Sequence, residues 1–294
     1  MAQTLLAVLL VLVGVQTLPD LARLRDFSWL KFWLARWGGG AAEGSAAMAL
    51  LLPLILVVVC LLIQGALAQV LFGLPAFAFG VAVLFYCWGP RDLEADIDAV
   101  LKAPDSDRRH AAAQMLRPEP AMQELPLESS ALVEATFLSA LSRWFGVLFW
   151  FVILGPAGAL GYRVVQLLAR HPAFIDETNA QQRPPLERAA LILDWAPAHL
   201  MALTLALVSE FDAVMMTWRD YHGAHGKGYF ALDLGFLGAL ARAGIDADVI
   251  AGDGYASELN DPLVELADAR TVLKRILVTW LAVIALLVLA GWAA

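Results

Sequence analysis

Residues 46–88 contain no charged side chain and are mostly apolar. A helix needs about 20 apolar residues to cross a bilayer, so this stretch is long enough to do so twice. Gln69 lies near its middle, where a turn is expected. We therefore predict a helical hairpin of two membrane helices, Ala46–Leu67 and Val70–Trp88. A water-soluble globular domain is excluded, since it could not bury both helices on all sides.

The composition agrees with a membrane protein. Charged residues make up 16% of the chain, against about 25% in an average soluble domain, and the mean hydropathy is +0.68. The net charge of −8 argues against nucleic acid as a partner. Cys60 and Cys87 lie in the two apolar runs at depths that differ by about 13 Å, so we predict two buried free thiols and no disulfide.

Four further apolar segments complete a prediction of about six membrane helices. They are Ala2–Leu18, Phe145–Leu168, Ala189–Val208 and Ile276–Trp292, and Gly155-Pro156 interrupts the second of these four. The predicted fold is all-α: a polytopic integral membrane protein that forms one domain over residues 1–294. The first segment is expected to remain as a helix, because no basic residue precedes it as in a signal peptide. For the third of these four, a re-entrant or surface-lying helix stays open, because an aspartate costs about 2.5–3.5 kcal/mol at a helix centre.

The basic residues predict the orientation. Loops 19–45, 89–144 and 209–275 together carry sixteen Lys and Arg residues, against three in the loops on the other side. Basic loops stay in the cytoplasm. Both termini are therefore predicted to be periplasmic, in a bacterial inner membrane.

Amphipathic helices are expected in these cytoplasmic loops. Asp26–Trp37 has tryptophans on one helical face and Lys31 and Arg36 on the other, which is typical of a helix on the membrane surface. The alternative is a helix packed on the bundle. Ser130–Trp144 is expected to run into the fourth span. Asp261-Pro262 predicts the start of a helix that continues into the sixth, and the acidic stretch Asp92–Asp98 is interpreted as a solvated face.

Arg163 and Asp194 are charged residues inside predicted spans. Antiparallel packing of the fourth and fifth spans would put them at nearly the same depth. Charges inside a membrane usually face the protein interior and pair. Two interpretations remain open: a salt bridge that fixes helix packing, or a polar site for a substrate or signal.

The segment that follows Asp194 adds to this candidate site. Pro197 lacks a backbone N–H, so it should free the carbonyl of residue 193 and kink the helix. A broken helix with a carboxylate and the imidazole of His199 suits a small ligand, although His199 could also be a buried histidine without a ligand. The candidate buried polar site comprises Arg163, Asp194, His199, Tyr162, Trp195 and Pro197.

A metal site is a weaker hypothesis. Asp220, His222 and His225 offer three ligand types, but a glycine-rich loop does not hold two imidazoles in fixed geometry, and no fourth ligand is evident. We therefore expect no metal and no other cofactor. No Ser/His/Asp or Cys/His arrangement can be identified, so no catalytic residue is predicted.

Several motifs resemble a known family. They are Phe149-Trp150, Gly155-Pro156-Ala157-Gly158-Ala159, Tyr162-Arg163, Leu193-Asp194-Trp195-Ala196-Pro197 and Trp218-Arg219-Asp220. Over roughly Glu134–Gly244 the chain resembles the AmpE family, inner-membrane proteins associated with β-lactamase induction, within the CobD/CbiB superfamily. The resemblance implies a signalling or accessory protein linked to cell-wall stress, without enzymatic activity. Its implied partners are the lipid bilayer and a small cell-wall-derived ligand or a regulatory protein.

Two alternatives remain. The CobD/CbiB enzymes join an aminopropanol-type arm to a corrinoid carboxylate, so the resemblance also implies a corrinoid amide synthase. This chain lacks the polar motifs associated with those enzymes: it has no Arg-Asp-Thr run and no Asp-Asp pair in the fifth span, and His199 stands where an arginine is expected. The other alternative is a small-molecule transporter, with Arg163, Asp194 and His199 along its path.

Overall fold

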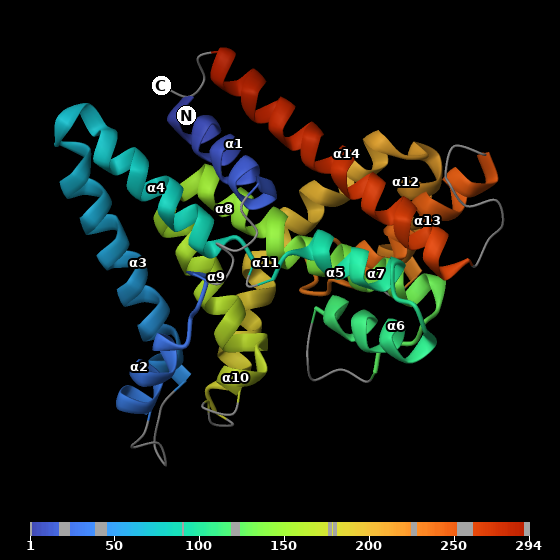
Figure 1. Cartoon of the computed structure of the whole chain (residues 1–294), viewed down its shortest axis with the longest axis horizontal. Helices are drawn as coiled ribbons and strands as arrows, with labels where there is room; N and C mark the ends of the chain where they lie inside the picture. The colour runs from blue at the N-terminus through green and yellow to red at the C-terminus, as the bar shows by residue number, and fades with distance from the viewer. Residues whose placement is uncertain are drawn as a thin grey trace. The chain divides into compact units, whose positions relative to one another are not determined.

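The computed structural model describes residues 2–17, 24–38, 46–89, 91–118, 124–175, 178, 181–224, 228–251 and 261–290. Within these ranges every regular element is a helix, which confirms the predicted all-α fold (Figure 1). The chain forms two compact units, and each is considered by itself. The prediction of one membrane domain over residues 1–294 is not tested by this division.

The first unit consists of Met1–Pro90, Gly146–Leu193 and Ile284–Ala294. Its helices are α1 (Ala2–Thr17), α2 (Trp29–Gly38), α3 (Ala46–Ala68), the short 3-10 helix η2 (Leu71–Gly73), α4 (Leu74–Cys87), α8 (Gly146–Leu154), α9 (Pro156–Arg170) and α10 (Pro172–Ile175). Helix α9 packs on α3, α4 and α8, so it is the central helix of this unit.

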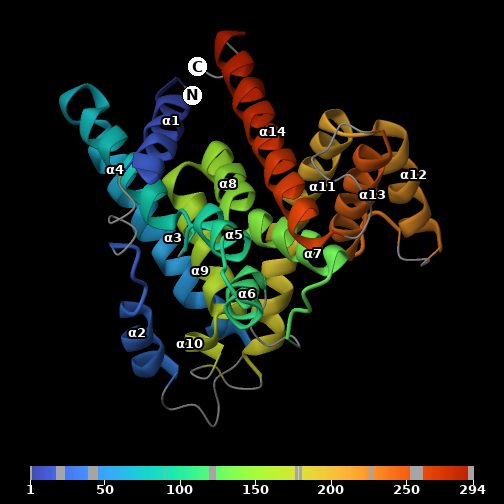
Figure 2. The same cartoon turned by 45° about the vertical axis from the view of Figure 1, so that its right-hand side comes forward.

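The second unit consists of Arg91–Phe145 and Asp194–Val283. Its helices are α5 (Leu93–Leu101), α6 (Ser106–Ala113), the 3-10 helix η3 (Gln114–Leu116), α7 (Ser129–Ala140), the π-helical segment η4 (Leu141–Phe145), α12 (Phe211–Ala224) and α13 (Gly235–Ala251). Helices α11 (Arg183–Val208) and α14 (Pro262–Leu289) contribute residues to both units. Helix α13 packs on α7 and α12, and it lies beside α12 in Figures 1 and 2.

Apolar helices occur where hydropathy predicts them. Among the residues that the structure describes, four helices are long and apolar enough to cross a membrane, namely Ala49–Ala68, Ser129–Leu154, Arg183–Val208 and Pro262–Leu289. Two shorter ones, Gln3–Val15 and Leu71–Cys87, correspond to the first and third predicted segments. These helices support a membrane protein, whereas the inner membrane and the orientation of the termini stay predictions.

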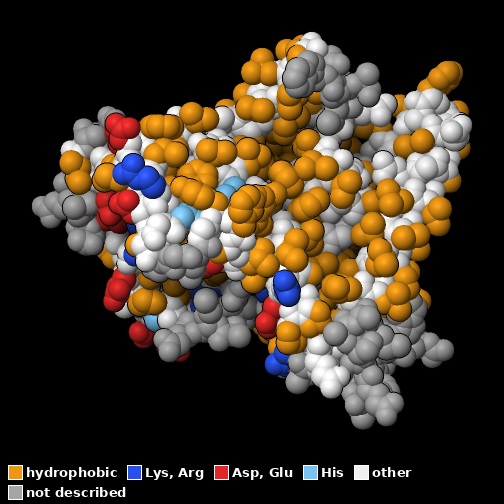
Figure 3. Space-filling model, turned by 180° about the vertical axis from the view of Figure 1, so that it is seen from behind, with side chains coloured by type: hydrophobic (Ala, Val, Ile, Leu, Met, Phe, Trp, Pro, Cys, Tyr) orange, Lys and Arg blue, Asp and Glu red, His pale blue; other side chains and the backbone are white. Residues whose placement is uncertain are grey.

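Helices α3 and α4 form the predicted hairpin. The turn between them contains Phe72 and Gly73 at positive φ (57° and 80°), and the Phe72 side chain is fully exposed. Figure 3 shows apolar side chains spread over this hairpin without a charged one. Such a surface is stable only against lipid or another apolar partner. Cys60 and Cys87 are both buried and free, as predicted.

The predicted single span Phe145–Leu168 is wrong. Gly155 has φ 67° and ψ −154°, a conformation that is essentially restricted to glycine, and it interrupts the helix. Helices α8 and α9 then pack on each other as an antiparallel hairpin. A Cβ at Gly146 would overlap the Tyr162 hydroxyl, and one at Gly158 would overlap the Trp150 backbone oxygen. The missing side chains therefore let the two helices approach closely.

The hairpin of α8 and α9 also affects the predicted orientation of the chain in the membrane. The long helix of this region is Ser129–Leu154, which runs from α7 through η4 into α8. This confirms that Ser130–Trp144 continues into the fourth apolar segment. The charge count assumed one crossing over Phe145–Leu168, so the assignment of the later loops to one side no longer follows from it.

Helix α2 combines features of both interpretations of Asp26–Trp37. Leu30 is fully buried in a cluster with residues of α3 and α9, as a helix packed on the bundle requires. Trp29 and Trp33 are 36% and 39% exposed, and the Trp29 indole donates a hydrogen bond to the Tyr86 hydroxyl at 2.8 Å. Both tryptophans are thus accessible, and their place at a membrane surface stays a prediction.

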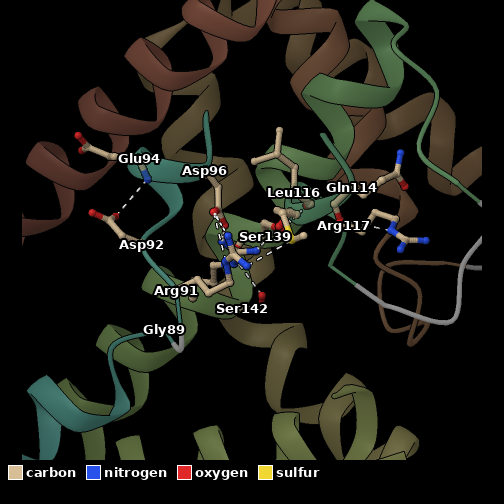
Figure 4. Close-up of polar contacts among 12 residues, drawn as sticks. Gly89, Arg91, Asp92, Glu94, Asp96, Gln114, Leu116, Arg117, Ser139 and Ser142 are labelled. Atoms are coloured by element: carbon tan, nitrogen blue, oxygen red, sulfur yellow. Dashed lines mark hydrogen bonds and ion pairs between the residues drawn. The ribbon is translucent and has the colours of Figure 1, made fainter. Parts of the chain in front are cut away.

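The interpretation of Asp92–Asp98 as a solvated face is wrong for Asp96. This carboxylate is 4% exposed. It accepts a hydrogen bond from Arg143 at 2.7 Å and another from Arg91 at 2.9 Å, and Figure 4 shows the Arg91 contact. Arg143 lies in the π-helical segment η4 and also donates to the carbonyl of Met115 at 2.7 Å. Burial of the aspartate is tolerated because both charges are paired and hydrogen-bonded.

The other acidic side chains of α5 lie nearer the surface. Asp98 contacts Lys102 at 2.6 Å and Arg270 of α14 at 2.7 Å, and Glu94 contacts Lys274 of α14 at 3.2 Å. The hydrogen bond from Lys102 and the two positive charges hold the pKa of Asp98 below its usual value. These ion pairs attach α5 to α14.

Helix α14 begins as predicted. The Asp261 side chain accepts hydrogen bonds from the backbone N–H groups of Leu263 and Val264, at 3.1 and 3.3 Å. Pro262 occupies the first helical position, where a missing N–H costs nothing. The helix continues without a break through the sixth predicted span to Leu289.

Candidate functional site

Pro197 does not break α11, which continues to Val208. The carbonyl that Pro197 cannot pair belongs to Leu193, and the Trp150 indole N–H donates a hydrogen bond to it at 3.0 Å. A side chain from α8 thus replaces the missing backbone donor. This contact explains how a proline is accommodated inside an apolar helix, where a carbonyl without a donor would be costly.

We expect Trp150→Phe to lower the free energy of unfolding by about 1 kcal/mol, the usual net value of one hydrogen bond. The cause is the Leu193 carbonyl, which would lose its donor. Thermal unfolding in detergent measures the loss. Pro197→Ala supplies a backbone N–H for the same carbonyl, so Trp150→Phe should cost less in that background. If Trp150→Phe lowers the free energy of unfolding equally in the wild type and in the Pro197→Ala variant, the Trp150 indole does not replace the missing backbone donor.

The predicted residues of α11 lie in the second unit. Asp194 is fully buried. The Trp195 indole donates to the carbonyl of Tyr229 at 3.1 Å, and His199 Nδ1 lies 2.7 Å from the carbonyl of Trp195. A carbonyl only accepts, so Nδ1 carries a proton. His199 Nε2 is buried and makes no hydrogen bond of normal geometry.

The remaining predicted residues lie in the first unit. Arg163 is 3% exposed, and its Nε donates to the carbonyl of Cys87 at the end of α4, at 2.7 Å. Tyr162 is 1% exposed and lies against Gly146. Arg163 and Asp194 belong to different units, so their pairing stays a prediction, as does the combined site.

An aromatic cluster surrounds His199 in the second unit. The His199 ring lies 4.4 Å from that of Trp195, 4.7 Å from Phe236 and 5.9 Å from Trp218, measured between ring centroids. Further stacked pairs are His222 with Tyr229 at 4.5 Å, Trp195 with Phe230 at 5.8 Å and Trp218 with Phe236 at 6.1 Å. The cluster joins α11, α12, α13 and the segment between the last two.

A cavity of about 590 Å³ adjoins this cluster. Its volume is in the range of small-molecule sites. Trp218 and Tyr229 connect it to the cluster. It is lined by Leu203 of α11, by Asp212, Met215, Met216, Trp218 and Arg219 of α12, and by Tyr229. Apolar walls with a few polar groups are typical of a ligand-binding site.

The metal hypothesis finds no support in the described part of the chain. His222 is buried, and its Nδ1 lies 2.9 Å from the carbonyl of Trp218, while Asp220 is exposed beside Arg219. His225 lies outside the described residues. No group of three or more His, Cys, Asp or Glu side chains that could hold a metal occurs among the described residues.

A hydrogen bond supports the segment after α12. Tyr221 donates from its hydroxyl to Asp233 at 2.9 Å. Burial and this carboxylate raise the pKa of Tyr221 to about 12, so the phenol stays protonated at neutral pH. The bond connects α12 to the start of α13, which follows Tyr229 in the chain.

Most residues of the aromatic cluster were not predicted from the sequence. Tyr229, Phe230 and Phe236 were not singled out as site residues, and Trp218 entered only through the family resemblance. One signal was available. Trp195 and His199, like Trp218 and His222, are four residues apart, a spacing that puts both rings on one face of a helix.

Two comparisons with known proteins give matches. A family model described as CobD/Cbib protein matches residues 23–228. The cobalamin biosynthesis protein CobD of Chromobacterium violaceum is 27% identical over 181 residues, which cover 60% of this chain and 56% of that protein. The alignment thus spans little more than half the length of this relative. No solved structure matches the chain.

These matches correct the predictions that were based on the resemblance to the AmpE family. The expectation that the chain has no enzymatic activity is contradicted by the family match, together with a relative named for cobalamin biosynthesis. Neither match names a regulator of β-lactamase or a transporter. The family model covers more than half of the sequence, including α3, α4, α7–α9 and α11. The chain therefore belongs to the CobD/CbiB family.

Proposed function

We propose that the protein is a membrane-bound enzyme of cobalamin biosynthesis that joins an amine to a carboxylate of a corrinoid. The observation that carries this proposal is the family match over residues 23–228. The named relative supports the same pathway. The reaction itself is the one that resemblance to the CobD/CbiB enzymes implies.

The second unit offers a site with suitable chemistry. A corrinoid is a large molecule with apolar faces and polar arms. Aromatic side chains such as Trp195 and Phe230 bind apolar surfaces, and the neighbouring cavity lined by Trp218 and Arg219 has a volume of about 590 Å³. The missing Asp-Asp pair and the histidine at position 199 mean that the family's polar motifs do not assign catalytic residues in this chain.

Complementation tests the proposal. The gene should restore growth without added cobalamin to a bacterial auxotroph that lacks its corrinoid amide synthase. An empty vector is the negative control, and an immunoblot of the membrane fraction establishes that the protein is produced. Continued auxotrophy with the protein present in the membrane would contradict the proposed function.

A further inference from the structure

A second cavity lies between α3 and α4, within the first unit. Its volume is about 390 Å³, which is in the range of small-molecule sites. Its walls come from the segment Leu56–Ile63 of α3 and the segment Phe79–Tyr86 of α4, and Leu160 of α9 completes it. We call it the hairpin groove. Each segment makes about two helical turns, so the groove extends roughly 10 Å along the helices.

The packing of α3 and α4 on α9 explains why this space is open. Both helices pack on α9. A Cβ at Gly161 of α9 would lie 2.6 Å from Val57 of α3, and a Cβ at Gly80 of α4 would lie 3.6 Å from Pro156 of α9. Glycines thus bring each helix close to α9. Between α3 and α4 the lining includes Ala82, whose side chain is too short to fill the space.

The lining of the hairpin groove is apolar. None of the described residues that line it is charged. The Cys60 thiol behaves as a small apolar group. The Tyr86 hydroxyl accepts a hydrogen bond from the Trp29 indole at 2.8 Å and donates one to the carbonyl of Asp26. A polar ligand would give up its hydrogen bonds to water here with little replacement, which is costly. The occupant must therefore be apolar.

The groove opens on the surface that α3 presents to the membrane. Of the apolar span in α3, 17% is buried in the protein. Val59 and Ile63 line the groove and are 44% and 41% exposed. Residues 46–88, which include both walls, contain no charged side chain. The groove is thus continuous with a surface that contacts lipid, and lipid chains are the apolar molecules next to it.

We propose that the hairpin groove binds one acyl chain of a bilayer phospholipid, which lies along α3 and α4. The chain covers the apolar side chains that the two helices do not cover for each other. Recognition depends on the chain and not on the head group, because no charged side chain lines the groove among the described residues. This lipid site is independent of the proposed function.

Native mass spectrometry of the purified full chain in neutral detergent tests the proposal. Titration with dioleoyl phosphatidylcholine should show one phospholipid that binds more tightly than any later one. Dihexanoyl phosphatidylcholine has the same head group but six-carbon chains, so it should bind at least about tenfold more weakly. Dioleoyl phosphatidylglycerol has the same chains and a charged head group, so its affinity should agree within about threefold.

Substitutions that fill the groove locate the binding site. Ala82→Leu fills it from α4 and Val59→Phe fills it from α3, and each should weaken binding of the first phospholipid about tenfold. Ala282→Leu of α14 is the matched control. It makes the same change as Ala82→Leu at an exposed position of an apolar helix, but it does not line the groove. It should leave the binding unchanged.

Three outcomes would overturn the lipid site. The first is unchanged binding of dioleoyl phosphatidylcholine in both Ala82→Leu and Val59→Phe. The second is a preference of more than about tenfold for one head group, which an apolar groove does not explain. The third is a dimer in the spectra of the unchanged protein that Ala82→Leu converts to a monomer, because the occupant would then be a second copy of this chain.

Discussion

Asp96→Ala is expected to lower the free energy of unfolding by about 3–5 kcal/mol, the cost of breaking a buried ion pair on one side. The reason is the charge that remains. Arg143 is 9% exposed and would lose its carboxylate partner at 2.7 Å. Arg91 would lose the same partner at 2.9 Å. Denaturation of the detergent-solubilised protein, followed by circular dichroism, measures the change.

Two comparisons make this result specific. Asp220→Ala removes a carboxylate that is 67% exposed, so it should cost less than about 1 kcal/mol. The double variant Asp96→Leu, Arg143→Met removes both charges and should recover much of the loss, because no buried charge is left alone. If Asp96→Ala lowers the free energy of unfolding no more than Asp220→Ala does, the ion pairs of Asp96 with Arg143 and Arg91 are not important for stability.

Asp96 also illustrates a limit of prediction from the sequence. An acidic stretch is usually solvated, and three of its four carboxylates do lie at or near the surface. Which one faces inward depends on Arg143, whose position is set by the π-helical segment η4 far along the chain. Charge density within a window of sequence does not contain that information.

The apolar helices were predictable because hydropathy depends only on local sequence. Thus the ranges of α3, α4 and α14 are close to those expected. Hydropathy does not record the direction of the chain, so the reversal at Gly155 inside one apolar run was missed. The Gly155-Pro156 dipeptide was visible, and it is a known turn signal. Its consequence depended on the packing between Gly158 and Trp150.

The candidate site was predicted in part for a similar reason. The segment from Asp194 to His199 was recognised, because an acid and a proline are unusual inside an apolar helix. The rings that surround His199 come from α12, α13 and the segment between them. Contacts between residues of different helices cannot be deduced from the spacing of residues along either helix. Motif resemblance likewise favoured the AmpE branch, which the wider comparison does not support.

Gly158→Ala is expected to lower the free energy of unfolding by about 2–3 kcal/mol, in the upper range for overpacked sites. The added Cβ would overlap the Trp150 backbone oxygen and lie 2.7 Å from Leu154 Cβ. A backbone atom cannot rotate away as a side chain can, so α8 and α9 must separate. The loss should exceed the gain of roughly 1 kcal/mol that alanine brings to a helix interior.

Gly65→Ala in α3 is the matched control for this prediction. It makes the same chemical change inside a helix, but its Cβ would meet nothing within 4 Å. It should therefore leave stability unchanged or raise it by up to about 1 kcal/mol. Thermal unfolding of both variants in one detergent gives the comparison. Equal melting temperatures for Gly158→Ala and Gly65→Ala would mean that the hairpin tolerates separation, and that its close approach does not require glycine.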